Sequence, residues 1–325
     1  LGHSVTILER QKQAGGLSTY GIAYYKMKPQ VSLAEVKLVQ SLGVELQTGV
    51  AVGQHVTITE LEKAYDALFV GVGLGAASRL HIPGEDLPEV RDALEFISQI
   101  HTDPLHTVPV GHRVAVIGAG NTAIDAVTQS KRLGAERAFI VYRRAEGDMS
   151  AYDFEYEHAK HDGAQFIFHA MPVEIVAANG HVTGLKLVRT RVTKGKLEPV
   201  AGSEWIEPCD LVLKAVGQEK QVKLLRRLFP DLVVDDRGVI AHDPLTGQTN
   251  LPHVFVGGDC GNGGREVVNA VGEGKKAAHG IHAFLTQQTA QPPVQPSRLG
   301  AKQGATGSGL LAPIRAHELV AAMKL

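Results

Sequence analysis

Residues 113–127 read RVAVIGAGNTAIDAV and carry the clearest structural signal in the chain. Residues 113–117 predict a buried strand and residues 121–133 a helix, joined by a turn of pattern G-x-G-x-x-A, Gly118-Ala119-Gly120-Asn121-Thr122-Ala123. The first glycine permits a tight turn, the second lets a pyrophosphate approach the backbone, and small Ala123 lets the helix pack closely on the strand. The helix N-terminus adds free N–H groups. The stretch predicts a dinucleotide-binding turn rather than a glycine-rich turn without a ligand.

Two arginines follow the next strand of this unit. Residues 139–142 predict that strand, and Arg143 and Arg144 come directly after it. An acidic residue at this place holds the ribose hydroxyls of NAD, whereas arginine pairs with the 2′-phosphate of NADP. We therefore expect NADP(H) rather than NAD(H). The alternatives are two merely solvated arginines, or a ribose contact from Glu146 or Asp148.

A second nucleotide-binding unit is predicted at the start of the chain. Residues 5–8 form its strand, Glu9 lies at the strand's end where a carboxylate typically holds a ribose, and Gly15-Gly16-Leu17 lets the backbone pass close to a cofactor. Residue 1 is Leu rather than Met, and no glycine turn precedes the strand. We expect the sequence to be a fragment that lacks the first strand and turn of this unit.

Three more apolar runs end at glycines: residues 67–72 before Gly73, 211–216 before Gly217, and 253–256 before Gly258 and Asp259. We expect these glycines to lie against a cofactor. The Asp259 carboxylate suits a flavin's ribityl hydroxyl, and a helix over residues 267–285 would direct its N-terminus at the pyrophosphate.

The alternation of strands and helices predicts an α/β chain of two Rossmann-like dinucleotide-binding domains. A β-meander is expected within residues 166–207, with hairpin turns at Asn179-Gly180 and Lys194-Gly195. A discontinuous FAD-binding domain is expected at residues 1–107 and 219–285, and an NAD(P)-binding domain at residues 108–218. Residues 286–325 are expected to be a disordered linker or tail, with a partner-docking helix as the alternative.

Composition excludes several functions. The 325 residues carry 33 Lys+Arg and 34 Asp+Glu, so bulk charge gives no reason to expect a nucleic-acid or anionic-membrane partner. No apolar run is long enough to span a bilayer and no signal peptide is evident, so we expect a cytoplasmic protein. Cys209 and Cys260 stand outside any C-x-x-C, and no His cluster has metal-ligand spacing, so we expect no metal site. Glu155 and Glu157 are expected to be solvated helix residues, and a contact with the nicotinamide-side ribose is the alternative.

The motifs GGLSTYGI (15–22), GVGLG (71–75), IPGEDLP (82–88), VIGAGNTAID (116–125), VYRR (141–144), KAVGQ (214–218), LPHVFVGGD (251–259) and VNAV (268–271) occur in this order. Together they resemble the two-dinucleotide-binding-domain flavoproteins. Within these, the chain is most similar to the glutamate synthase small-subunit-like group, and inside that group to the flavin/NAD(P) subunit of bacterial dihydropyrimidine dehydrogenase. The resemblance covers about residues 1–285.

The resemblance implies two cofactors. FAD would contact Glu9, Gly16, Leu17, Lys26, Val52, Gly258 and Asp259. NADP(H) or NAD(H) would contact Gly120, Asn121, Thr122, Arg143, Arg144 and Gly217. Iron–sulfur clusters would lie only in a missing N-terminal part or in a partner.

The activity implied is electron transfer from NAD(P)H through FAD to iron–sulfur centres and a partner subunit that reduces pyrimidines. A glutamate synthase electron-input protein, whose partner reduces 2-iminoglutarate, and a non-catalytic nucleotide-binding or assembly module are the alternatives. Hydride transfer between cofactors needs orientation rather than a general acid or base, so no catalytic side chain is expected. A thioredoxin reductase is disfavoured because its C-x-x-C is absent.

Overall fold

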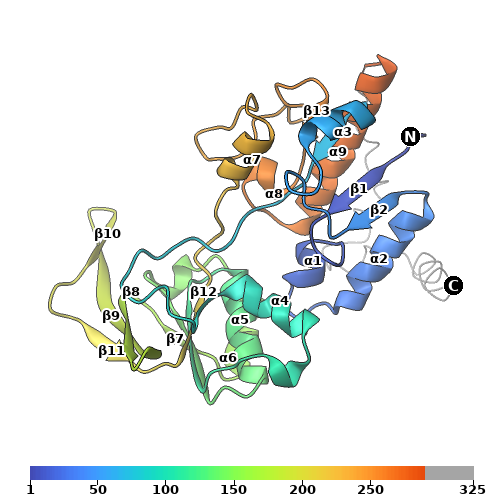
Figure 1. The fold of residues 1–325 in the computed structure, drawn as a ribbon. Helices are drawn as coiled ribbons and strands as arrows, with labels where there is room; N and C mark the ends of the chain where they lie inside the picture. The colour runs from blue at the N-terminus through green and yellow to red at the C-terminus, as the bar shows by residue number, and fades with distance from the viewer. Residues whose placement is uncertain (290–325) are drawn as a thin grey trace, which may run out of the picture. The chain divides into compact units, whose positions relative to one another are not determined.

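The structure, a computed structural model, describes residues 1–289, and these divide into two compact units (Figure 1). Unit 1 contains residues 1–10, 37–73 and the described residues from 220 onward, and unit 2 contains residues 11–36 and 74–219. Of the predicted tail, residues 290–325 lie outside the described residues.

A five-stranded parallel sheet forms the centre of unit 2, in the order β4-β12-β5-β6-β7. Its strands are β4 (Val90–Asp92), β5 (Arg113–Ile117), β6 (Arg137–Val141), β7 (Gln165–Ile167) and β12 (Leu211–Lys214). The helices of the unit include α1 (Leu17–Tyr20), α4 (Ala93–Thr102), α5 (Asn121–Arg132) and α6 (Asp153–His161). The predicted strand at 113–117 is confirmed, and the predicted helix after it begins at the same residue.

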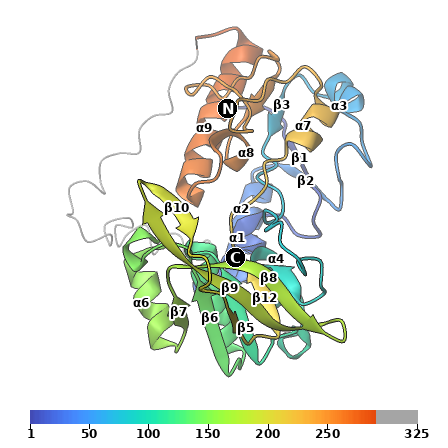
Figure 2. The same cartoon turned by 90° about the vertical axis from the view of Figure 1, so that its left-hand side faces the viewer.

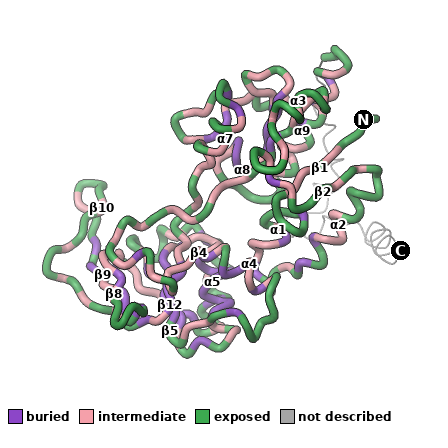
Figure 3. The backbone as a smooth tube through the Cα atoms, in the orientation of Figure 1, coloured by how far each residue is buried: buried purple, intermediate pink, exposed green. Residues whose placement is uncertain are grey.

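Alternate residues of β5 pack into two different cores. Val114 and Val116 pack with apolar residues of α4 and α5, whereas Ala115 and Ile117 pack with strands of the meander. A strand buried on both faces is a continuous apolar run, as the sequence of β5 is. Figure 3 shows the buried residues gathered along β5, β12 and α5. Unit 2 is therefore layered, with helices on one face of the parallel sheet and an antiparallel sheet on the other (Figure 2).

The predicted β-meander is confirmed. Its strands are β8 (Ala170–Ala178), β9 (His181–Thr193), β10 (Lys196–Pro199) and β11 (Trp205–Glu207). The long strand β9 pairs antiparallel with each of the other three. Both predicted hairpin turns have two successive residues with positive φ, 53° and 81° at Asn179-Gly180 and 51° and 76° at Lys194-Gly195. Such turns match the twist of the flanking strands.

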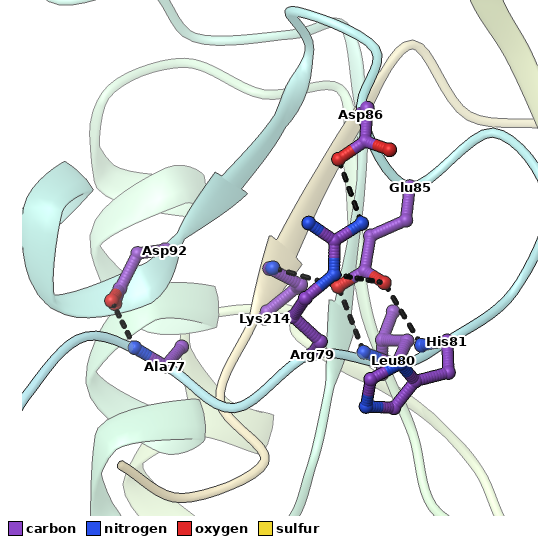
Figure 4. A network of polar contacts seen from close by, with 8 residues as sticks. All are labelled: Ala77, Arg79, Leu80, His81, Glu85, Asp86, Asp92 and Lys214. Atoms are coloured by element: carbon purple, nitrogen blue, oxygen red, sulfur yellow. Dashed lines mark hydrogen bonds and ion pairs between the residues drawn. The ribbon is translucent and has the colours of Figure 1, made fainter. Parts of the chain in front are cut away.

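Within unit 2, hydrogen bonds and ion pairs of Glu85 hold the IPGEDLP segment (residues 82–88) in place. Glu85 accepts hydrogen bonds from the Leu80 and His81 backbone N–H groups, and it pairs with the Lys214 ammonium at 2.9 Å and with Arg79 (Figure 4). Burial alone would raise the pKa of Glu85, but these hydrogen bonds outweigh burial and lower it. Because Lys214 ends β12, the buried carboxylate fixes this segment to the central sheet.

Unit 1 contains two pairs of parallel strands. β1 (Thr6–Glu9) pairs with β2 (Glu45–Thr48), and β3 (Leu68–Val70) pairs with β13 (Val254–Val256). Within residues 1–289 no strand joins the two pairs. Other elements of the unit are α3 (Ile58–Ala64), α7 (Val222–Leu228), α8 (Asp259–Asn262) and α9 (Val267–Thr286), while α2 (Pro29–Ser41) contains the boundary between the units.

The units differ from the predicted domains in two segments. Residues 11–36 and 74–107 belong to unit 2, although they were predicted as part of the flavin domain. The physical reason is packing, since α1 contacts α4, α4 packs on α5, and β4 extends the central sheet beside β12. None of the helices in residues 1–289 has both the length and the apolar character that crossing a bilayer requires.

Candidate dinucleotide-binding site

The turn after β5 depends on a glycine at position 118. Gly118 has φ 132°, and a Cβ there would lie 2.2 Å from the carbonyl oxygen of Ala215, the residue that follows β12. A side chain would therefore collide with backbone. The first glycine of the motif lets the turn pass close to the segment that follows β12, in which the predicted contact Gly217 lies.

The N-terminus of α5 is open to an anion. Its N-cap is Gly120, which has no side chain to cap the first N–H groups. A Cβ at Gly120 would lie 3.3 Å from the Ser150 Oγ, a tight contact for which the serine side chain would have to shift slightly, so the glycine leaves more room at this position. Helix N-termini of this kind bind phosphate groups through free N–H groups and the helix dipole. Thr122 lies in this first turn, and Ala123 is fully buried beneath it.

The segment before α6 contacts the glycine turn. The Ala151 N–H donates to the Ala119 carbonyl at 3.2 Å, and the Tyr152 N–H donates to Asn121 Oδ1 at 3.2 Å. Asn121, predicted as a nucleotide contact, therefore also holds this segment in place.

Arg143 and Arg144 lie just beyond β6 with exposed side chains. Their backbone carbonyls are fixed, since Arg143 O accepts from Thr190 Oγ1 at 2.6 Å and Arg144 O accepts from the His169 N–H. Among the salt bridges of residues 1–289, none involves either guanidinium. Both positive charges are thus available to a ligand at the carboxyl end of the sheet.

Glu146 and Asp148, the alternative ribose contacts in the same loop, each accept a hydrogen bond within the protein. Glu146 accepts a hydrogen bond from the Tyr156 hydroxyl at 2.6 Å, and the Asp148 carboxylate accepts from the Ala145 N–H at 3.3 Å. Whether the arginines or the carboxylates contact the ribose stays a prediction.

The residues expected to contact FAD lie in both units. Gly16 and Leu17 are in unit 2, at the start of α1, where Gly16 has φ 54° and a Cβ would meet nothing within 4 Å. The unit 1 members are Glu9 at the end of β1, Val52, Gly73 after β3, and Gly258 and Asp259 at the start of α8. These flavin contacts stay predictions.

Lys26 lies in unit 2, where its ammonium pairs with Asp125 on α5 and Glu155 on α6. The expectation that Glu155 is solvated is wrong, because only 10% of its side chain is exposed. Sequence reasoning missed Asp125 and Glu155, although an acid within the buried part of α5 is a detectable signal. A contact of Lys26 with FAD stays a prediction.

Neither cysteine is placed for redox chemistry. Cys260 is buried in the core of unit 1 beside Val70 and Val256, and burial raises its pKa. Burial also raises the pKa of Cys209 to about 12. In residues 1–289 no three His, Cys, Asp or Glu side chains gather in a way that would bind a metal ion.

Comparison with known protein families decides the relationship. A family model described as pyridine nucleotide-disulphide oxidoreductase matches residues 1–274. The chain belongs to this family. The predicted class, a flavin oxidoreductase that uses NAD(P)H, is that of the family.

Two curated relatives are each 34% identical to this member of the family. The NADP(+)-dependent formate dehydrogenase subunit beta of Moorella thermoacetica aligns over 90% of this chain and 42% of its own length. The glutamate synthase [NADPH] small chain of Escherichia coli (strain K12) aligns over 87% of this chain and 64% of its own length. The predicted glutamate synthase small-subunit-like group is confirmed. This chain spans less than two thirds of either relative.

Solved structures confirm the predicted fold. FprA of Mycobacterium tuberculosis in complex with NADPH superposes with a TM-score of 0.70 and 21% identity, over 98% of this chain and 82% of that one. Thioredoxin reductase of T. acidophilum gives a TM-score of 0.65 and 20% identity, over 88% and 91% of the two chains. Both establish the two-dinucleotide-binding-domain fold.

Proposed function

We propose that this chain is the NADPH-oxidising, flavin-containing part of an electron-input subunit. One observation carries the proposal: a helix N-terminus without a side-chain cap lies at the carboxyl end of β5, and two exposed arginines, which form no salt bridge within residues 1–289, lie at the carboxyl end of the adjacent strand β6. Ligands of open α/β sheets bind at this end of the strands.

The residues of unit 2 have separate tasks in this proposal. The N–H groups of residues 119–122 bind the diphosphate, and Gly120 leaves room for its approach. Arg143 and Arg144 bind the 2′-phosphate through charge-assisted hydrogen bonds. Gly217, exposed after β12, borders the nicotinamide half.

FAD, when bound, accepts a hydride from the reduced nicotinamide and releases the electrons singly. We propose that Glu9 and Asp259 bind its ribose and ribityl hydroxyls, and that the open backbone at Gly16 lets the cofactor lie close to the chain. No side chain is assigned a proton-transfer role, since hydride transfer depends on the orientation of the two rings.

A partner subunit is proposed to receive the electrons. Relatives named as a beta subunit and a small chain, of formate dehydrogenase and glutamate synthase, support this arrangement. Iron–sulfur centres outside this sequence are the proposed carriers. The first candidate is the predicted pyrimidine-reducing partner, as in dihydropyrimidine dehydrogenase. The second candidate is a glutamate synthase-like partner, which the name of one relative supports.

The test is anaerobic titration of the protein, reconstituted with FAD, with NADPH and with NADH. We expect flavin absorbance at about 450 nm to bleach, and to do so at lower concentrations of NADPH than of NADH. Binding of NADP+ without flavin binding or bleaching would favour the non-catalytic nucleotide-binding module. Absence of both nucleotide binding and bleaching would contradict the proposal.

A further inference from the structure

Unit 2 contains a charge cluster built around two buried carboxylates, and it is formed by Tyr25, Lys26, Asp125 and Glu155. The Lys26 Nζ lies 2.6 Å from Asp125 Oδ1 and 2.7 Å from Glu155 Oε1. The Tyr25 hydroxyl donates to Asp125 Oδ1 at 3.1 Å. Only 8% of the Asp125 side chain, 10% of the Glu155 side chain and 23% of the Lys26 side chain are exposed. We call these four residues the Lys26 cluster.

The cluster has one cation for two carboxylates. Burial raises the pKa of Asp125, an effect that the Lys26 ammonium only partly offsets. Burial and the Asp125 charge raise the pKa of Tyr25, which keeps its hydroxyl a donor. Glu155 Oε2 is buried without a hydrogen-bond partner in the described chain. Removing the ammonium would therefore leave two buried carboxylates close together without a cation, which is strongly unfavourable.

The two carboxylates belong to the helices that flank the glycine turn. Asp125 lies one turn into α5, and Glu155 lies in the first turn of α6. The residues just before α6 contact the turn, through the Ala151 N–H to the Ala119 carbonyl and the Tyr152 N–H to Asn121 Oδ1. Lys26 thus joins the same two elements whose N-terminal ends meet at the turn.

We propose that Lys26 is a positioning residue for the dinucleotide site: by bridging Asp125 and Glu155 it holds α5 against α6 and keeps the N–H groups of residues 119–122 in binding geometry. The proposal rests on the proposed function of the turn as the NADP(H) diphosphate site. It assigns to Lys26 a task within unit 2 that does not depend on the predicted contact with FAD.

The test compares NADP+ affinity, by calorimetry on the folded full chain, among wild type, Lys26→Met and Lys26→Arg. We expect Lys26→Met to weaken binding roughly tenfold to hundredfold, since small misplacements of binding groups have effects of that size. Lys26→Arg keeps a cation between the carboxylates and is expected to restore most of the affinity. Lys28→Met, which removes an exposed lysine two residues away, is the matched control and is expected to bind like wild type.

A purely stabilising role makes a different prediction. In that case Lys26→Met would lower the melting temperature but bind NADP+ as wild type does once folded, and this result would overturn the proposal. If Lys26→Met does not fold, the triple variant Lys26→Met/Asp125→Asn/Glu155→Gln removes the buried charges together. The triple variant is expected to bind more weakly than wild type, and equal affinity would again overturn the proposal.

Hydrogen exchange tests the positioning role of Lys26 independently of whether the protein binds NADP+. Lys26→Met, or the triple variant if Lys26→Met does not fold, is expected to exchange the amides of residues 119–123 and 150–153 faster than wild type without any ligand. Failure of wild type to bind NADP+ would contradict the proposed function alone. Unchanged exchange in these two segments would contradict the positioning role.

Discussion

Arg143 and Arg144 are the residues on which nucleotide specificity depends in this account. Their backbones are fixed by Thr190 and His169 while their side chains are exposed. We predict that Arg143→Ala/Arg144→Ala weakens NADP+ binding about 100-fold and NAD+ binding much less, because each charge-assisted hydrogen bond contributes about 1.5 kcal/mol or more. Calorimetry with both nucleotides measures the difference.

Arg113→Ala is the control for this double variant. Arg113 is exposed at the amino end of β5, the opposite end of the sheet from the glycine turn, so its loss should leave both affinities unchanged. Equal losses of NADP+ and NAD+ affinity in the double variant would rule out the 2′-phosphate assignment.

Glu85 is a residue whose loss should lower the stability of unit 2. Glu85→Gln leaves the Lys214 ammonium, 14% exposed, without its carboxylate, and we predict a loss of about 3 kcal/mol in the free energy of unfolding at neutral pH. Because the pKa of Glu85 is lowered in the folded state, its contribution is complete above the ordinary glutamate pKa and is lost as the pH falls through the lowered value.

Denaturant titrations at neutral and acidic pH measure this effect. Asp86→Asn is the matched control, since the Asp86 side chain is 82% exposed and pairs with the exposed Arg79; it should change stability by less than about 1 kcal/mol. A Glu85→Gln deficit that grows on acidification would be incompatible with the lowered pKa.

The two glycines of the turn between β5 and α5 are predicted to have different roles, with Gly118 needed for the fold and Gly120 for ligand binding. Gly118→Ala would place a Cβ 2.2 Å from a backbone oxygen at φ 132°, so we predict a destabilisation of roughly 3 kcal/mol or more. Gly120→Ala meets only a serine hydroxyl at 3.3 Å, so we predict a small change in melting temperature but roughly tenfold weaker NADP+ binding, because the methyl group occupies space needed by the diphosphate. Thermal unfolding and calorimetry on both variants test this division, and the reverse pattern would contradict it.

The sequence predicts individual elements well where the signal is local. The strand at 113–117, the helix after it and the two hairpin turns follow from apolar runs and turn residues, and each is found in the structure. Glu155 was misjudged because its pairing with Lys26 joins residues 129 positions apart. Nothing in the local pattern of α6 distinguishes a buried acid from its exposed neighbour Glu157.

At the scale of the whole molecule, packing determines which segments share a unit. The motif order indicated two dinucleotide-binding domains, and the solved relatives confirm that fold. The assignment of residues 11–36 and 74–107 to unit 2 could not be derived from motifs, because it depends on how α1, α4 and β4 pack against α5 and the central sheet. The Lys26 cluster exists only because residues 11–36 pack in this way.

The most direct test of the account is a crystal structure of the protein grown with NADP+. We predict a diphosphate against the backbone N–H groups of residues 119–122 and a 2′-phosphate against Arg143 and Arg144. A nucleotide bound elsewhere, or a glycine turn without ligand at saturating NADP+, would contradict the central claim.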